Sequence, residues 1–560
     1  MCVRIIFNLA YVIIGRRILQ VLLLAVVSGG AVSAQKKIFY PGAPSVDVII
    51  DGNRVENCWT VMPSINPDVF QTTAKEIIFI SDRDTLKIDQ LKEWETFDFA
   101  MVTNEGDTAN VRVERMAANP FENPSPQLLK VSPSGILTKS QAQFDIDAMI
   151  YTLSQVHPDI FSTCSQAELF QAVNRAKAAL PDSVTPVDLY RVAAPIVAMI
   201  GDGHTNLNFP YNSIFTRQSK RLPVFVDVLP DKTLSCRSSL DSIIGRGDRV
   251  LSINGISSDS IVNAMLPFVS GEKTHFKLSR VNSLFSALHK MLFDADEYVV
   301  RYQPKGSKKI LSHVFPGSTY DEIMQRCPKV RSGNKHDIYS FEVDSVNNVA
   351  VMDFRSFSNT NRMVHFTDSM FRELKNKNIT NLIIDLRNNG GGNSEVGDIL
   401  LQYISPEPFV QMEKSLIRVT PTTAKLIGNG SITPMFELFE TNPSDYILPR
   451  TVDQGHYSGK VYLLTSNSTF SSAGSFAWAF KVCGIGTVIG EETGGMNVAY
   501  GDILSYDLPI SQLNMSISFK RFWQFRADEK DIHGTIPDIS VPSSTALDEA
   551  MKLAKKNKRK

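Results

Sequence analysis

The feature that most constrains the fold is the alternation of apolar runs with helix-like segments between residues 338 and 545. Runs such as NVAVMDFRSF, NLIIDLRNN, KVYLLTSNS and GTVIGEE are typical of buried strands, and the segments at 363–377, 394–403 and 472–482 are typical of helices. Strands that are regularly separated by helices imply a mainly parallel sheet with helices on its faces. We therefore predict a layered α/β domain over 338–545.

The chain has 560 residues. A single hydrophobic core does not organise a chain of that length, so further domains are expected. Strand-like runs predict a β-sandwich-like domain at 36–118, and the prolines of 119–135 indicate a linker. Helical periodicity, with Thr138 and Gln141 as a capping box, predicts a helical domain at 136–215. Strands and an Asn-Gly turn at 221–315 are typical of a PDZ-like module, although any β-hairpin can carry that turn.

Residues 1–34 predict an export signal. Two arginines precede an apolar run from Ile18 to Val27, and small residues follow up to Ala34. That run is shorter than a membrane span needs, so cleavage after Ala34 is favoured, while an uncleaved membrane anchor stays open. We expect an exported protein, periplasmic or extracellular, whose mature chain has no membrane-spanning segment.

Charge and cysteine content give no support to several classes of function. Lys+Arg and Asp+Glu balance at 58 each, so nothing indicates nucleic acid or an anionic membrane as a partner. Cys2 lies in the predicted signal, and the other cysteines are scattered without the spacing of a disulfide framework or a metal site. We therefore expect neither a metal nor a cofactor, and the sequence does not specify the oligomeric state.

The strongest local motif is TFSSAGS, from Thr469 to Ser475, which follows a predicted strand and opens a predicted helix. At such a corner the serine Oγ is exposed, and the N–H groups of the helix start stabilise nearby negative charge. Acyl-transfer enzymes use this arrangement for the nucleophile and the oxyanion hole together. Serine is also a frequent N-cap, so Ser471 or Ser472 could have only that role.

Two further motifs carry candidate chemistry. The segment DLRNNGGG, from Asp385 to Gly392, also lies between a predicted strand and a predicted helix, and its glycines let backbone N–H groups approach a substrate. A flexible loop is the plain alternative, and a phosphate loop is disfavoured because no Gly-Lys-Ser/Thr follows. His204 ends a tight turn at 201–203, from which its ring can reach a cleft and act as a base for a serine.

Taken in order, these motifs resemble those of the C-terminal processing (tail-specific) peptidases, and more closely their tricorn-core-like branch. The resemblance covers residues 136–545. DGHT, from Asp202 to Thr205, is followed by a PDZ-like insert with GDRVLSING, then by DLRNNGGG, TFSSAG and IGEETGG. It implies a ClpP/crotonase-like catalytic domain and serine endopeptidase activity on polypeptide substrates.

The resemblance also implies roles for single residues. The nucleophile of the family falls on Ser471, and the oxyanion hole falls on the backbone amides of Gly390, Gly391 and Ser472. Members with a Ser-Lys dyad take their base from a lysine beyond the GE motif, and the matching residue here is Met496. The resemblance therefore points to the branch in which a histidine is the base.

In that branch the matching histidine is His204, and a glutamate network supports it. The resemblance places the supporting acid just before the closing G-x-x-P-D motif, where Glu529 and Asp531 are the candidates and the spacing favours Asp531. Gly203 stands where tricorn itself has a serine, so that helper hydroxyl is absent or supplied elsewhere.

Two other classes of function stay open. A catalytically inactive peptide-binding protein on the same fold stays open because of the missing lysine and because of Gly474, where many members have glutamate. A crotonase-type enzyme that acts on acyl-thioesters shares the layered fold, but it needs neither the PDZ-like insert nor the pair of Ser471 and His204. Labelling by a serine-reactive phosphonate separates the active protease from the inactive protein.

Overall fold

The computed structural model describes the strands that lie within the first 115 residues and most of the chain after them. The later described residues are 120–121, 124–130, 135–327, 337–428, 437–443 and 445–557. The chain forms two compact units. One comprises Met1–Thr185, Leu416–Thr441 and Asp502–Lys520, and the other comprises Pro186–Ser415, Asn442–Gly501 and Arg521–Lys560.

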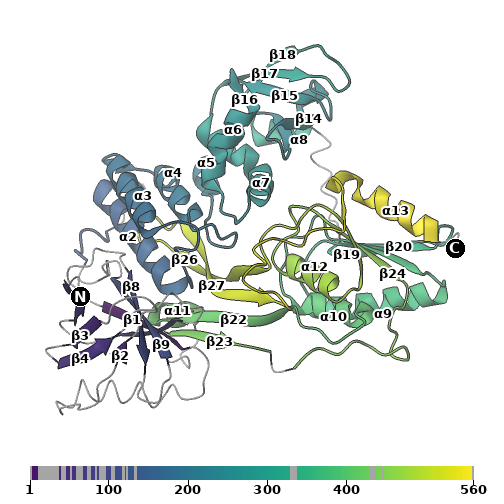
Figure 1. The fold of residues 1–560 in the computed structure, drawn as a ribbon. Helices are drawn as coiled ribbons and strands as arrows, with labels where there is room; N and C mark the ends of the chain where they lie inside the picture. Colours follow the sequence, from purple (N-terminus) through teal and green to yellow (C-terminus); the bar gives the residue numbers. More distant parts are fainter. Residues whose placement is uncertain are drawn as a thin grey trace. The chain divides into compact units, whose positions relative to one another are not determined.

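The N-terminal part of the first unit is built from antiparallel strands, drawn in purple and dark blue in Figure 1. One sheet has the order β2-β8-β9-β1-β5 and the other has the order β4-β3-β6-β7. Their bounds are β1 (Val3–Leu9), β2 (Lys37–Ile38), β3 (Val46–Ile50), β4 (Asn53–Cys58), β5 (Pro67–Gln71), β6 (Ile77–Ser81), β7 (Thr85–Lys87), β8 (Thr96–Val102) and β9 (Thr108–Arg115).

Strand β1 lies inside the segment that the sequence predicts to be an export signal, and it pairs with β5 and β9. The other residues of 1–34, Cys2 among them, and much of the predicted linker at 119–135 lie outside the described residues. Export and the position of the cleavage site therefore stay predictions.

Helices follow these strands. α2 (Lys139–Val156) begins at the predicted capping box, in which Thr138 and Gln141 each bond to the backbone of the other. After α3 (Gln166–Ala179), helix α4 (Pro186–Ala198) opens the second unit. The helical domain predicted at 136–215 is thus divided at Thr185, and the turn that carries His204 belongs to the second unit. Within the described residues no helix is both long and apolar enough to cross a membrane.

The segment predicted as an insert forms its own antiparallel sheet in the second unit, with the order β13-β14-β15-β17-β18 and the short β16 (Ile256–Ser257) paired to β15. Helices α6 (Ser258–Met265) and α7 (Thr274–Leu292) accompany it, and α7 packs against β13. The Asn-Gly turn lies between β15 and β16, with positive φ at Asn254 and Gly255. The strands are β13 (Val224–Val228), β14 (Leu234–Ser239), β15 (Arg249–Ile253), β17 (Glu297–Gln303) and β18 (Leu311–Pro316).

The predicted α/β domain contains a six-stranded sheet with the order β19-β20-β21-β24-β25-β28. Only the β19–β20 pair is antiparallel, and the other four pairs are parallel, so the prediction of a mainly parallel sheet is confirmed. The strands are β19 (Tyr339–Asp344), β20 (Val349–Phe354), β21 (Asn381–Asp385), β24 (Lys460–Thr465), β25 (Gly486–Gly490) and β28 (Ile539–Ser540).

Helices cover both faces of this sheet, as Figure 1 shows. The larger core lies between the sheet and helices α9 (Thr360–Asn376), α10 (Glu395–Ile404) and α12 (Ser472–Val482). A smaller core on the other face holds Ile383, Leu464 and three alanines of α13 (Ala546–Asn557). Burial on both faces explains why the central strands are continuous apolar runs.

Three further long strands, β22 (Met412–Val419), β26 (Val498–Asp507) and β27 (Asn514–Gln524), are not among the predicted elements. Strand β27 pairs with both β22 and β26, and β22 pairs in turn with β23 (Glu437–Thr441).

Leu400→Ala tests the larger core. Leu400 is fully buried on α10, and we expect the substitution to lower the free energy of unfolding by about 2–5 kcal/mol because it removes buried methyl groups and leaves a cavity. Leu448→Ala is the control, because that side chain is 69% exposed and its loss is expected to change stability by no more than about 0.5 kcal/mol. Urea unfolding measures both, and equal effects would contradict the assigned core.

Candidate active site

Ser471 lies at the corner between strand β24 and helix α12. Its φ of 55° and ψ of −131° lie outside the regions that a residue with a side chain normally adopts. Such a conformation costs on the order of 1–3 kcal/mol, so the surrounding structure must hold it. The Ser471 side chain does not cap α12, and its Oγ lies 2.9 Å from Nε2 of His204. The N-cap role alone therefore does not account for this serine.

Hydrogen bonds between the loops after two neighbouring parallel strands hold this corner. Thr469 Oγ1 donates to the carbonyl of Leu386 at 2.8 Å, and Ser466 Oγ donates to the carbonyl of Arg387 at 2.6 Å. Both serine and threonine follow β24, and both acceptors follow β21. The carboxyl ends of these strands thus place the TFSSAG and DLRNNGGG motifs side by side.

Asn389 joins the same two loops from inside the protein. Its side chain is fully buried. Its Nδ2 donates to the Phe354 carbonyl at 2.8 Å, its Oδ1 accepts the Gly391 N–H at 2.9 Å, and its carbonyl accepts the Phe470 N–H at 3.2 Å. The sequence analysis missed this residue, although an amide between a buried strand and a glycine turn is well suited to bond backbone groups.

The glycine turn packs directly on the nucleophile. Gly391 has a φ of 98°, and a Cβ built there would lie 2.7 Å from Cβ of Ser471 and 2.9 Å from the nitrogen of Ser472. Its own N–H is donated to Asn389. The expectation that the Gly391 amide binds an oxyanion is therefore corrected, and its role is to permit this close approach.

Two of the three amides assigned to the oxyanion hole remain as candidates. Among the hydrogen bonds of the described residues, none uses the N–H of Gly390 or of Ser472. The Ser472 hydroxyl has a separate task, since it donates to the Gly392 carbonyl at 2.6 Å. The Ser472 N–H opens helix α12, where a backbone N–H has no partner within the helix.

His204 reaches Ser471 from the turn that follows helix α4. Its backbone N–H donates to Oδ1 of the fully buried Asp202 at 2.9 Å, and its ring packs on the Phe470 ring with centroids 4.4 Å apart. The Nδ1 atom is buried without a hydrogen-bond partner and lies 3.8 Å from Oδ1 of Asp202. The structure thus brings together the histidine and the serine that the sequence singled out.

The two acids expected to orient His204 have other partners. Glu529 accepts hydrogen bonds from Arg521 at 2.7 Å and from Nε1 of Trp523 at 2.9 Å. Asp531 accepts the Asp528 N–H at 2.8 Å and lies 3.6 Å from His533. Within the described part of the chain neither acid forms an ion pair or hydrogen bond with His204. That expectation is corrected, because the Glu529 carboxylate is directed onto side chains of β27 and Asp531 stays within its own turn.

A different carboxylate lies behind the histidine turn. Glu272 Oε1 accepts the Gly203 N–H at 3.1 Å, and Arg280 donates to the Gly203 carbonyl at 2.7 Å. Burial raises the pKa of Glu272 to about 7 and the nearby Asp202 raises it too, while the Gly203 N–H and His204 act in the opposite direction. Glu272 lies in the segment predicted as an insert, and no sequence motif indicated it.

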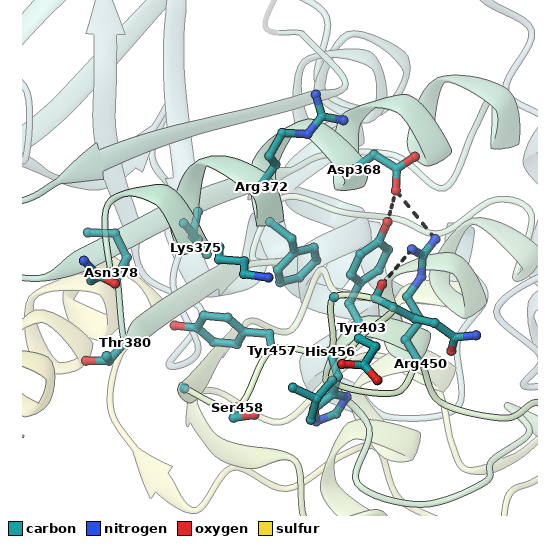
Figure 2. A pocket seen from close by; sticks show the side chains of 18 of the residues that line it. Asp368, Arg372, Lys375, Asn378, Thr380, Tyr403, Arg450, His456, Tyr457 and Ser458 are labelled. Carbon is teal, nitrogen blue, oxygen red and sulfur yellow. Dashed lines mark hydrogen bonds and ion pairs between the residues drawn. The ribbon is translucent and has the colours of Figure 1, made fainter.

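A cavity of about 780 Å³ lies apart from these groups, at the other end of strands β21 and β24 (Figure 2). Its wall includes Tyr403, which donates to Asp368 and lies 3.9 Å below the Arg450 guanidinium. None of the candidate catalytic residues lines it. Among the described residues, no group of three or more His, Cys, Asp or Glu side chains could hold a metal ion.

Comparison with known proteins, like the geometry of the site, indicates a peptidase. Residues 348–541 match the model of peptidase family S41. The crystal structure of mature CPAF is similar with a TM-score of 0.54 at 13% identity, covering 74% of this chain and 97% of that one. Mature CPAF complexed with lactacystin gives 0.53 at 14% identity, covering 75% and 97%. At these identities the structural likeness shows a shared fold.

Proposed function

We propose that this chain is an endopeptidase with Ser471 as nucleophile and His204 as general base. The proposal starts from the family, because residues 348–541 are a peptidase family S41 domain and the chain is therefore a serine-type peptidase. The observation that carries the proposal is the 2.9 Å separation of Ser471 Oγ and His204 Nε2. A base must lie within hydrogen-bond reach of the proton that it removes. Its substrates are polypeptides.

The reaction follows from this geometry. His204 Nε2 takes the proton of Ser471 Oγ as the oxygen attacks a peptide carbonyl, and the N–H groups of Gly390 and Ser472 stabilise the oxyanion. His204 then gives the proton to the leaving amine, which departs and leaves an acyl-enzyme. Water, activated by the same imidazole, hydrolyses the acyl-enzyme and frees Ser471.

The hydrogen bonds of a lysine on helix α12 support the histidine-dependent form of the reaction. Lys481 lies on the helix that begins at Ser471, but its Nζ donates to Asp538 at 2.6 Å and to the Ile536 carbonyl at 2.7 Å. Met496 occupies the position at which Ser-Lys relatives carry their base. An inactive peptide-binding protein would not need the assembled pair of Ser471 and His204.

The accessory segments have proposed roles as well. The segment 221–315 is a PDZ-like module whose edge strand, β13, offers backbone groups to an extended substrate. The N-terminal β-rich domain is an accessory domain. The protein is exported to the periplasm or the exterior, with a mature N-terminus at or near Gln35 that N-terminal sequencing of the exported protein would identify.

Labelling with a fluorophosphonate tests the proposed function. We expect the folded enzyme to be labelled on Ser471 and to lose its cleavage of an unfolded protein, because the reagent reacts with an activated serine. Ser471→Ala should abolish labelling. Ser472→Ala, which keeps the backbone N–H, should retain it. Mass spectrometry locates the label, and a folded wild-type enzyme that is neither labelled nor active would contradict the proposal.

A further inference from the structure

Glu272 lies just before helix α7, and its carboxylate reaches the turn that carries the candidate base. Its Oε1 accepts the Gly203 N–H, while its Oε2 is buried without a hydrogen-bond partner. A carboxylate oxygen that is removed from water and left unpaired destabilises the folded state. A group of this kind close to a catalytic histidine therefore calls for a functional explanation.

The packing leaves no space for another side chain at this point. A Cβ on Gly203 would lie 2.6 Å from Cε1 of Phe276, 2.9 Å from Cζ of Phe470 and 3.0 Å from Oε2 of Glu272. The rings of Phe276 and Phe470 are themselves stacked, with centroids 4.2 Å apart. The polar group beside the histidine turn is therefore supplied by Glu272, since residue 203 cannot carry one.

Three charged side chains lie around the histidine turn. Asp202 and Glu272 are two carboxylates, and Arg280 is the cation that acts electrostatically on both. Arg280 donates to the Gly203 carbonyl and lies 5.4 Å from the centre of the Phe470 ring. Asp202 lies beside His204, and Glu272 adds a second negative charge there above its pKa of about 7. Such a charge favours the protonated form of an imidazole.

On the basis of the proposed function, we infer that Glu272 is a positioning residue for His204. Its carboxylate fixes the Gly203 peptide, and together with Asp202 it supplies the negative charge that stabilises the imidazolium formed when Ser471 gives up its proton. Glu272 acts through the turn at 201–205 and does not touch the substrate. The family resemblance implied this task for Asp531 or Glu529.

The inference gives the segment 221–315 a second role, in the active site itself. This segment contains Glu272, Phe276 and Arg280, all of which contact the histidine turn or the Phe470 ring. It therefore completes the active site in addition to any binding of substrate. Its deletion would remove these groups as well, so point substitutions are the sharper experiment.

The test compares Glu272→Gln and Glu272→Asp with the wild-type enzyme. Glu272→Gln keeps the size of the side chain but removes its charge, so we expect kcat to fall by roughly tenfold or more while KM changes by less than about twofold. Glu272 is an anion above its pKa of about 7, and an anion raises the pKa of a neighbouring histidine. Its removal should therefore shift the part of the acidic limb of the kcat/KM profile that lies above that pH to lower pH. Glu272→Asp keeps the charge and should retain a limb near that of wild type.

The control is Glu342→Gln, the same substitution at an exposed position on strand β19, and it should leave kcat and the pH profile unchanged. An unchanged kcat and limb in Glu272→Gln would overturn the inference. So would an equal loss of activity at every pH without a shift of the limb, because that result indicates a structural defect. If Glu272→Gln does not fold, a Glu272→Asp enzyme with its acidic limb displaced to lower pH overturns it equally.

The labelling experiment keeps this inference separate from the proposed function. If the wild-type enzyme is not labelled on Ser471 and does not cleave a polypeptide, the proposed function fails. If the wild-type enzyme does both and Glu272→Gln matches it in rate and pH profile, the role of Glu272 alone fails. The melting temperature of each variant shows that folded enzymes are being compared.

Discussion

Ser471→Ala and His204→Ala are each expected to lower kcat on an unfolded protein substrate by roughly 10⁵- to 10⁶-fold, the size of loss seen when one member of a serine-histidine unit is removed. The two side chains share one proton across 2.9 Å, so the loss of either one removes the proton transfer that activates the nucleophile. The double variant should therefore be no slower than either single variant. Progress curves with a fluorogenic unfolded protein measure these losses.

Lys481→Ala is the control for this pair. Lys481 is bonded to Asp538 and to the Ile536 carbonyl, so its removal should leave kcat within about twofold of wild type, as for an exposed ion pair. Full activity in His204→Ala would refute the histidine mechanism. A large loss in Lys481→Ala would point instead to a lysine base.

Gly391→Ala is expected to lower kcat by roughly 10²- to 10³-fold, as the loss of oxyanion stabilisation does in other serine enzymes. The new Cβ would meet Ser471 and the Phe470 carbonyl at 2.7 and 2.8 Å, on a backbone with a φ of 98°. The turn or the nucleophile must shift, and the oxyanion donors shift with it. Steady-state kinetics should show the loss in kcat with a smaller change in KM.

Gly390→Ala provides the matched comparison. A Cβ at Gly390 meets nothing within 4 Å, and its φ is not in the left-handed range. The substitution keeps the backbone N–H, so its effect on kcat should be far smaller than that of Gly391→Ala. Equal losses in the two variants would show that the close approach of Gly391 to Ser471 is not what the activity requires.

The layered domain could be predicted because its central strands are buried on both faces and therefore read as unbroken apolar runs. Strands β26 and β27 could not be predicted from the sequence. β26 contains Gly501 and Asp502, a pair that is typical of a turn. β27 mixes Lys520 and Arg521 with aromatic residues, so neither strand has the apolar continuity that marks a core strand.

Only part of the candidate site could be predicted from the sequence. Ser471 and His204 stand in local motifs whose order along the chain carried the resemblance. The supporting acid has no such motif, because Glu272 reaches the turn through tertiary packing, 69 positions away from Gly203. Spacing alone favoured Asp531, but the direction in which a loop folds is decided by contacts such as that between Glu529 and Trp523.

The backbone conformation of Ser471 has a consequence for how this protein can change over evolutionary time. At φ 55° and ψ −131°, glycine would be relaxed where serine is strained, so the substitution that most easily stabilises this corner also removes the nucleophile. Selection for stability and selection for activity therefore oppose each other at this position. An inactive descendant, freed from the second pressure, would be expected to lose its serine here early and to become more stable by doing so.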